Sequence, residues 1–319
     1  MKKILITGIT GFAGSHLAEF MVSEDKYTIW GTHISDRNLQ NLEKIREKIE
    51  LLKLDLVDAS KVAEIIESVK PDIIFHLAAF ASVGQSFQKP LDVFINNTAA
   101  ELNVLEGAKK AKLSGCKILV TSSAQVYGFV SEKDLPITEQ APFKPNNPYS
   151  VSKITQDYLA LQYFLEYKLS IVRLRPFNHL GPRLSAEFSI ARFAKDIARI
   201  EKGLIKPTLT VGNMATKRDF TDVRDMVQAY VKAADKCIDG EAYNIGSGTS
   251  YSMQEMLDKL LSLATVKISV EQDQSLFRPS DIPELRCDAT KFRQVTGWKP
   301  EIPIEKTLQD TLDYWRSLV

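Results

Sequence analysis

Tyr149 and Lys153 are separated by one helical turn, and their residue types suit proton transfer. Residues four positions apart share one face of a helix, so the phenol and the ammonium would be neighbours. A phenol with its ordinary pKa of about 10 exchanges protons poorly near neutral pH. A nearby positive charge favours the ionised phenol and brings its pKa closer to the working range. The pair predicts acid–base chemistry on a substrate oxygen.

A hydroxyl group can join this pair from residues 121–128, TSSAQVYG. The segment follows an apolar run that is typical of a buried parallel strand, and open α/β sheets bind ligands at the carboxyl ends of their strands. Ser123 could there hydrogen-bond the same substrate oxygen that Tyr149 protonates. Any surface helix can carry a Tyr and a Lys at this spacing, so the prediction depends on finding all three features in order along one chain.

Residues 7–14, TGITGFAG, form a second candidate site between an expected strand and an expected helix. Gly8 permits a tight turn, Gly11 lets the backbone approach a pyrophosphate, and Gly14 lets the helix pack closely on the strand. The helix N-terminus adds unpaired N–H groups and a partial positive charge. The segment therefore predicts dinucleotide binding, with the spacing GxxGxxG.

The end of the second strand bears on which dinucleotide is bound. NAD calls for a carboxylate there to accept from the ribose 2′-hydroxyl, but residues 33–37, HISDR, have none at the immediate tip. Asp36 comes late, whereas His33 and Arg37 could face a 2′-phosphate. We predict NADP in preference to NAD, although Arg37 fits a solvated loop charge equally well. Asp55 ends the third strand and either accepts from the adenine amine or caps a helix.

These sites need an alternating chain of strands and helices to position them. Strands are expected over residues 2–7, 27–32, 49–54, 72–77, 117–122 and 170–175. Helices are expected between them over residues 15–22, 38–48, 59–69, 96–111 and 149–167. This alternation implies right-handed crossovers and a parallel sheet with helices on both faces. We predict an α/β fold with a Rossmann-type doubly wound sheet.

After residue 176 the alternation weakens. Helices are expected over residues 188–202, 222–236, 253–264 and 306–318, extended segments over 207–211, 243–245 and 267–270, and turns over 277–303. We interpret this part as a smaller C-terminal substrate-binding α/β region. The predicted NAD(P)-binding domain spans 1–176 with about 213–246 returning to the sheet, and the predicted substrate domain spans 177–212 and 247–319.

Composition narrows the class of protein. The 319 residues carry a formal net charge of +1, which argues against a protein that coats nucleic acid or an anionic membrane. The apolar run after Met1 is too short for a signal core or a membrane span. Three widely spaced cysteines support neither a disulfide framework nor a metal site. We expect a cytoplasmic protein.

With these motifs in this order, the chain resembles the extended short-chain dehydrogenase/reductase family, in its nucleotide-sugar-modifying branch. Residues 76–79, HLAA, are similar to the family's strand end beside the cofactor, and the likeness extends to residues 297–300, GWKP. The resemblance implies a catalytic Ser123, Tyr149 and Lys153, with Lys153 also anchoring the nicotinamide ribose. The predicted cofactor-binding residues are Gly8, Gly11, Phe12, Ala13, Gly14, His33, Arg37, Asp55, Leu56, Leu77, Ala78, Ala79, Asn97, Thr121, Tyr149, Lys153 and Pro176.

Further segments resemble the group that contains GDP-mannose dehydratases and GDP-4-keto-6-deoxy-mannose reductases. They are residues 86–90 (SFQKP), 177–179 (FNH), 211–213 (VGN), 218–225 (RDFTDVRD) and 278–281 (RPSD). The resemblance implies a GDP-sugar substrate, whose diphosphate arginines bind well through paired, charge-assisted hydrogen bonds. The predicted substrate-binding residues are Ser82, Ser86, Asn178, Arg183, Val211, Asn213, Arg218, Arg278 and Asp281.

Gln125 distinguishes the reactions of this group. By the resemblance, the dehydratases carry a glutamate at this position, because removing water across C5–C6 of the sugar requires a base for the C5 proton. An amide cannot accept that proton, unless Gln125 is only neutral lining and Glu132 or Glu139 is the base. We predict a 4-keto reductase that makes GDP-D-rhamnose or its C4 epimer, with a GDP-mannose 4,6-dehydratase or a nucleotide-sugar 4-epimerase as alternatives. The resemblance also implies a homodimer or homotetramer through helices 96–112 and 149–167.

Overall fold

The computed structural model describes residues 1–113, 115–277 and 282–319, and it is built on a seven-stranded parallel sheet. The strand order is β10-β6-β5-β4-β1-β2-β3. The chain adds β2 and β3 on one side of β1 and then returns to add β4, β5 and β6 on the other side, so the order of strands reverses between β1 and β4. Ligands bind at such a reversal in open α/β sheets, at the carboxyl ends of the strands. The strands are β1 (Lys2–Thr7), β2 (Tyr27–His33), β3 (Ile49–Lys53), β4 (Ile73–His76), β5 (Lys117–Thr121), β6 (Ile171–Pro176) and β10 (Ala242–Ile245).

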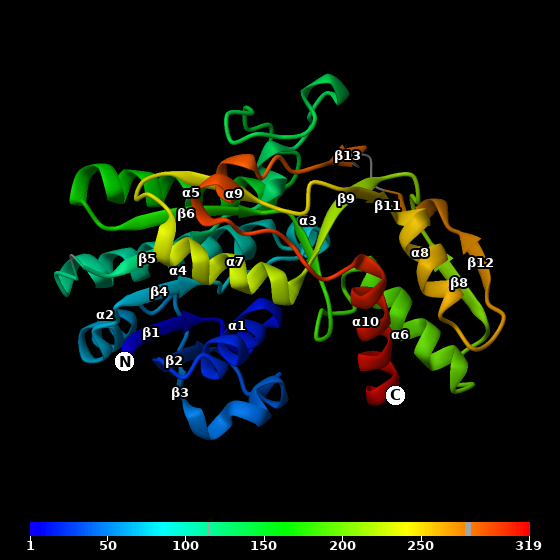
Figure 1. The fold of residues 1–319 in the computed structure, drawn as a ribbon, viewed down its shortest axis with the longest axis horizontal. Coiled ribbons are helices and arrows are strands. Elements are labelled where there is room, and N and C mark those ends of the chain that lie inside the picture. The colour runs from blue at the N-terminus through cyan, green and yellow to red at the C-terminus, as the bar shows by residue number, and fades with distance from the viewer. Residues whose placement is uncertain (114, 278–281) are drawn as a thin grey trace.

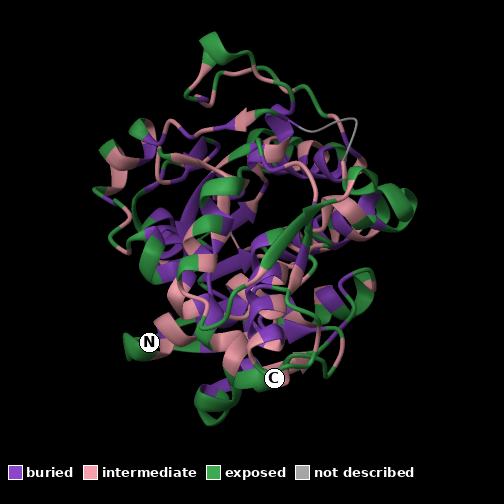
Figure 2. Ribbon diagram, turned by 90° about the vertical axis from the view of Figure 1, so that its right-hand side faces the viewer, coloured by how far each residue is buried: buried purple, intermediate pink, exposed green. Residues whose placement is uncertain are grey.

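Helices cover both faces of this sheet (Figure 1). Ile4 and Ile6 of β1 point into one apolar core with α1 (Phe12–Ser23) and α7 (Val223–Lys236). Leu5 points into the core on the other face, with α2 (Ala59–Val69), α4 (Pro90–Lys110) and α5 (Pro148–Tyr167). Alternating side chains of a strand face opposite ways, so a strand buried on both faces is a continuous apolar run. Figure 2 shows buried residues gathered in the interior of the molecule.

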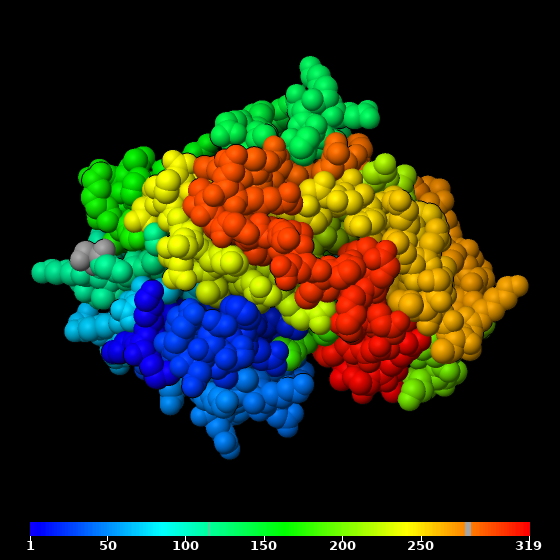
Figure 3. Space-filling model, viewed as in Figure 1, coloured from blue at the N-terminus to red at the C-terminus, as the bar shows by residue number. Residues whose placement is uncertain are grey.

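The C-terminal part builds a second apolar core beside the parallel sheet. It lies between the helices α6 (Ser189–Glu201), α8 (Met253–Ser262) and α10 (Ile304–Leu318) and the strand β8 (Thr208–Val211). The exposed strand β12 (Ser269–Gln272) pairs with β8. A small sheet links the two parts: β9 (Lys217–Asp222) pairs with β7 (Asn178–Leu180), β11 (Ser250–Ser252) and β13 (Glu284–Leu285). Figure 3 shows the chain after residue 282 crossing from α7 to the C-terminal helix.

The predicted fold class is confirmed, whereas some elements differ from the expectation. Residues expected as an exposed helix form 3-10 turns (η1, Leu39–Lys48), with Leu42 buried. Helix α4 begins at Pro90 rather than at residue 96, because a proline is well accommodated in the first helical turn. Several elements were missed because they are too short to show periodicity: α3 (Val83–Gln88), η2 (Ala124–Tyr127), η3 (Glu132–Asp134), η4 (Gln274–Leu276), α9 (Thr290–Thr296), β7, β11 and β13. Strand β9 was missed because its sequence, KRDFTD, is mostly polar and shows no apolar run.

Within the described part of the chain, no helix combines the length and apolar character needed to cross a membrane. Cys116, Cys237 and Cys287 are buried free thiols. The described His, Cys, Asp and Glu residues form no group of three or more that could hold a metal ion.

Candidate active site

Two cavities meet at the carboxyl ends of the central strands. The first, of about 350 Å³, runs from the glycine turn past Tyr149 and Lys153. The second, of about 330 Å³, lies between α3, α6 and the small sheet around β9. Gln125 and Asn178 line both cavities, so a ligand in one can touch a ligand in the other at this junction.

The glycine turn forms a cradle that side chains would fill. Gly8 has φ +70°, and a Cβ there would lie 2.9 Å from the Cα of Ala78. A Cβ at Gly14 would collide with the carbonyl oxygen of Gly8. Gly11 directly precedes α1, whose start has no side-chain cap. The exposed N–H groups of this turn and helix start therefore fit an anion such as a dinucleotide pyrophosphate.

The end of the first cavity beside β2 is lined by two amides, Asn38 and Asn41. Asn41 donates to the carbonyl oxygen of Thr10 over 3.0 Å, which fixes its side chain next to the glycine turn. None of the described residues lining this cavity is a carboxylate. Asp36, the late acidic residue of this region, instead accepts from Lys53 over 2.9 Å, and this hydrogen bond lowers the pKa of the carboxyl.

The start of α5 positions the candidate proton donor. Asn147 precedes this helix and its side chain accepts from the Ser150 N–H over 2.8 Å, while Pro148 occupies the first turn. Tyr149 follows immediately and is only 7% exposed. Burial raises the pKa of Tyr149 to about 12, opposed by its hydrogen bond to Ser123. The phenol therefore holds its proton at neutral pH.

One turn further along α5, Lys153 reaches the same cavity. Its Nζ donates to the Thr121 carbonyl oxygen over 2.8 Å and lies 5.9 Å from the centre of the Tyr149 ring. Burial lowers the pKa of Lys153 to about 8, while the charge of Glu101 acts in the opposite direction. The ammonium is thus held beside the phenol by the helix spacing and by the end of β5.

Two further polar residues hold the neighbouring strand end in place. Thr7 Oγ1 accepts from the Leu77 and Ala78 N–H groups over 3.1 and 3.2 Å, which fixes the turn after β4. Asn97 accepts from the Phe80 N–H over 2.8 Å and donates to Ser152 Oγ over 3.0 Å. Asn97 thereby ties the chain after β4 to α5.

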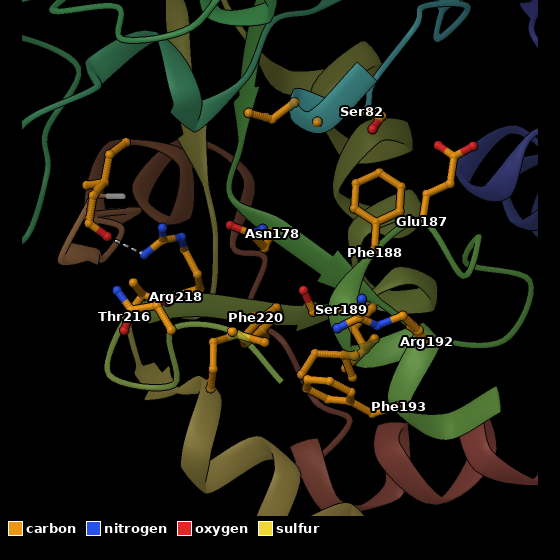
Figure 4. Close-up of a pocket in the computed structure, with 18 of the residues that line it drawn as sticks. Ser82, Asn178, Glu187, Phe188, Ser189, Arg192, Phe193, Thr216, Arg218 and Phe220 are labelled. Atoms are coloured by element: carbon orange, nitrogen blue, oxygen red, sulfur yellow. Dashed lines mark hydrogen bonds between the residues drawn. The ribbon is translucent and has the colours of Figure 1, made fainter. Parts of the chain in front are cut away.

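The second cavity combines positive and apolar groups (Figure 4). Arg218 and Arg192 line it from β9 and α6, and Figure 4 shows Asn178 between them. Arg218 donates to the carbonyl oxygens of Lys217 and Ile282 over 2.7 and 2.8 Å. The rings of Phe188, Phe193 and Phe220 add apolar walls. This arrangement suits a ligand with both anionic and flat apolar parts.

The structure brings most of the predicted site residues to these cavities. Those that line one or both are Gly8, Gly11, Phe12, Ala13, Gly14, Leu77, Ala79, Ser82, Thr121, Ser123, Gln125, Tyr149, Lys153, Pro176, Asn178, Arg183, Asn213 and Arg218. Those that line neither are His33, Arg37, Asp55, Leu56, Ala78, Ser86, Asn97 and Val211. Arg278 and Asp281 lie outside the described residues.

Several placements differ from what the resemblance implies. Arg183 lines the first cavity rather than the second and pairs with Glu19 over 2.5 Å. Ser86 is fully buried and donates to the Val83 carbonyl oxygen over 2.7 Å. The lining residues Arg192, Asn38 and Asn41 were missed. Both asparagines lie in the segment that follows the second strand, at the start of η1, and this was a usable signal because that strand end borders the dinucleotide.

No carboxylate stands at the junction of the two cavities within the described lining, where Gln125 lies. The two alternative bases are elsewhere: Glu132 belongs to the 3-10 turn η3, and the Glu139 carboxylate accepts from the Asn244 N–H over 2.8 Å. Glu187 is the carboxylate that the described lining of the second cavity contains, and it accepts from Gln85 Nε2 over 2.8 Å.

Known proteins resemble this chain over its full length. The family model for GDP-mannose 4,6 dehydratase matches residues 5–311. GDP-6-deoxy-D-mannose reductase of Pseudomonas aeruginosa is 32% identical, covering 100% of this chain and 98% of its own. GDP-mannose 4,6 dehydratase 2 of Arabidopsis thaliana is 30% identical, covering 98% and 86%. The solved structure of RMD from Pseudomonas aeruginosa complexed with NADPH superposes with a TM-score of 0.87 at 31% identity, covering 100% of both chains.

Proposed function

The chain belongs to the GDP-mannose 4,6-dehydratase family, and from this membership and the site we propose that it is an NAD(P)H-dependent nucleotide-sugar 4-keto reductase. The proposed reaction converts GDP-4-keto-6-deoxy-D-mannose to GDP-D-rhamnose or its C4 epimer. The observation that carries this proposal is Gln125 at the junction of the two cavities. An amide there leaves the Ser123, Tyr149 and Lys153 set complete for reduction but provides no base for the C5 proton.

The residues of this chain would do the following in the reduction. Bound NADPH or NADH would supply the hydride that reduces C4 of the sugar. Tyr149 would donate its proton to the C4 oxygen, because its raised pKa keeps it protonated, and Ser123 would hydrogen-bond the same oxygen. Lys153 would stabilise the phenolate that remains. A donor placed in this way contributes on the order of 10²–10⁴-fold in rate.

Our preference for NADP over NAD rests on the end of the first cavity beside β2. Its described lining holds the amides of Asn38 and Asn41 and no carboxylate. A carboxylate would repel a 2′-phosphate and accept from a free 2′-hydroxyl, so its absence from the lining removes the usual reason to prefer NAD. Arg37 is exposed next to this end of the cavity and can approach the phosphate.

The substrate class rests on the second cavity. We assign the diphosphate to Arg218, with Arg192 as a second cation, and the sugar to the junction beside Asn178. Guanidinium groups bind phosphates through paired hydrogen bonds, which a solvated lysine provides less rigidly. The phenylalanine walls would then contact the base. The proposed division follows the predicted domains: residues 1–176 and about 213–246 bind the cofactor, and residues 177–212 and 247–319 bind the sugar nucleotide.

We further propose a homodimer or homotetramer through α4 and α5, in a cytoplasmic setting. Large apolar side chains are exposed on α4 (Leu91, Phe94, Ile95 and Leu102) and on α5 (Val151, Tyr158 and Leu165). An apolar surface shared by two adjacent helices favours burial against a second copy. The buried free thiols fit a reducing compartment.

The dehydratase alternative depends on Glu187, because a dehydratase requires a carboxylate near the sugar and Glu187 lines the second cavity.

The proposed reductase function is tested by supplying the purified protein with GDP-4-keto-6-deoxy-D-mannose and either NADPH or NADH, and by following the absorbance of the reduced nicotinamide. We expect oxidation of the cofactor that depends on the keto sugar. Conversion of GDP-mannose without added reductant, with no cofactor oxidation by the keto sugar, would establish the dehydratase instead.

A further inference from the structure

Two polar side chains lie completely buried between α4 and α5. Glu101 and Gln156 are each 0% exposed. By strict geometry, neither the carboxyl oxygens of Glu101 nor the carboxamide of Gln156 has a hydrogen-bond partner among the described residues. The two groups are close enough, however, for a hydrogen bond from Gln156 to lower the pKa of Glu101. Buried polar groups are nearly always well paired, so a buried carboxyl group with only this one weak partner requires an explanation.

The packing of the two helices places Glu101 and Gln156 within one helical turn of the level of Lys153. Helices α4 and α5 follow adjacent parallel strands and cover the same sheet face, so they run in the same direction. Asn97 of α4 donates to Ser152 of α5 over 3.0 Å, which sets the level at which the helices meet. Glu101 and Gln156 lie one turn further along their helices. Lys153, directly after Ser152, lies between these two levels.

The charges around Glu101 come from three elements. Burial raises the pKa of Glu101 and the Asp157 charge on α5 raises it further, while the Lys153 ammonium and the Gln156 carboxamide lower it. Burial lowers the pKa of Lys153, and the Glu101 charge raises it. His76 of β4 also faces Lys153, but burial lowers its pKa to about 3, so its ring is neutral. Glu101 and Lys153 therefore each favour the charged form of the other.

We propose that Glu101 is a positioning residue for proton transfer, whose charge acts on Lys153 across the helix pair and keeps that lysine positively charged as the pH rises. The inference rests on the proposed function, because it assigns Lys153 to stabilising the Tyr149 phenolate. Burial and the Asp157 charge favour the protonated form of the Glu101 carboxyl group. When Glu101 loses its proton, the carboxylate that remains favours the ammonium form of Lys153. Without Glu101, loss of a proton would leave a neutral amine beside Tyr149.

The first test compares the wild type with Glu101→Gln over a range of pH, using kcat for the proposed reduction. Glutamine has about the same size as the protonated acid and is also neutral. We therefore expect kcat at neutral pH to change by less than about twofold, which is small beside the tenfold effect of a pKa shift of one unit. The basic limb of the profile should move to lower pH by about one unit, because Lys153 loses its opposite charge. Glu106→Gln on the same helix, whose carboxylate pairs with Lys109, is the control. A basic limb left in place by Glu101→Gln would overturn the proposal.

The second test needs no substrate or cofactor. Ionisation of Glu101 is disfavoured in the folded protein, so the advantage in Tm of Glu101→Gln over the wild type should grow as the pH rises above the ordinary range of a glutamate. Lys153→Met should change this advantage, because the two groups interact. Additive effects of the two substitutions at every pH would overturn the pairing even if the reductase assay succeeds. If the two substitutions are not additive but the protein reduces no keto sugar, the pairing of Glu101 with Lys153 stands and only the proposed function is wrong.

Discussion

Lys153 Nζ donates to the backbone carbonyl oxygen of Thr121 over 2.8 Å. Thr121 is the last residue of β5, and Lys153 lies in α5, so this hydrogen bond joins the helix that carries Tyr149 to the strand end that precedes Ser123. Two of the candidate catalytic residues, Tyr149 and Lys153, are thereby held on α5, and Ser123 lies two residues beyond the end of β5. Precise catalytic geometry is easier to keep on helices and strand ends than on long loops.

Tyr149→Phe removes the proposed proton donor and leaves the ring in place. We expect kcat for the keto sugar to fall by about 10²–10⁴-fold, because the C4 oxygen loses its acid. Binding of NADPH, followed by its fluorescence, should change little. Tyr158→Phe is the control, since Tyr158 lies on the same helix but is 55% exposed. Equal rates for Tyr149→Phe and the wild type would refute the catalytic assignment.

Gly11→Ala and Gly14→Ala separate cofactor binding from folding. A Cβ at Gly11 meets only the Gly8 carbonyl oxygen, at 3.2 Å, and φ there is −71°, so the variant should fold. The added methyl group would project toward the phosphates and weaken NADPH binding by about tenfold or more, equal to about 1.4 kcal/mol. Gly14→Ala would collide with the Gly8 carbonyl oxygen and should destabilise the protein by about 1–3 kcal/mol. Urea denaturation and cofactor titration measure the two effects. A Gly11→Ala protein with unchanged NADPH affinity would contradict the proposed pyrophosphate site.

Gln125→Glu places a carboxylate at the junction of the two cavities. We expect kcat for reduction to fall by about tenfold or more, because a negative charge opposes the negative charge that develops on the C4 oxygen. The new carboxylate should also increase the exchange of the C5 hydrogen of the keto sugar with deuterated water, measured by mass spectrometry. Gln125→Met, a neutral side chain of similar length, is the control. If Gln125→Glu neither slows reduction nor speeds exchange, Gln125 does not stand beside the sugar.

Arg218→Ala should raise KM for the sugar nucleotide by about 10–100-fold and change kcat much less, because it removes binding shared by the ground and transition states. Steady-state kinetics with varied keto sugar at saturating NADPH measures both values. Arg46→Ala is the control, because Arg46 is exposed and lines neither cavity. A fall in kcat with KM unchanged would place Arg218 outside the diphosphate site.

Acid should destabilise the protein through His76. Burial lowers the pKa of its folded form to about 3 from 6.5. Below pH 6.5 the unfolded chain takes up a proton that the folded chain does not, so the free energy of unfolding falls by up to about 1.4 kcal/mol per pH unit until about pH 3. His76→Asn should flatten this dependence, as urea denaturation at several pH values would show. Parallel curves for the two proteins would mean that His76 does not cause it.

The sequence by itself was enough to predict the fold class and the centre of the site. The glycines of residues 7–14, the spacing of Tyr149 and Lys153, and the alternation of apolar runs with helices all depend on residues close together in the chain. Local periodicity and turn chemistry report such features directly. Gln125 could be placed near the chemistry because it follows a strand end.

The tertiary structure alone decided what meets across elements. Arg192 reaches the second cavity because α6 packs over β8, and Glu101 lies behind Lys153 because α4 and α5 pack side by side. Arg183 faces the first cavity because it pairs with Glu19 of α1. Side chains from distant segments become neighbours only when the strand order and the helix faces are set, and no local pattern records that order.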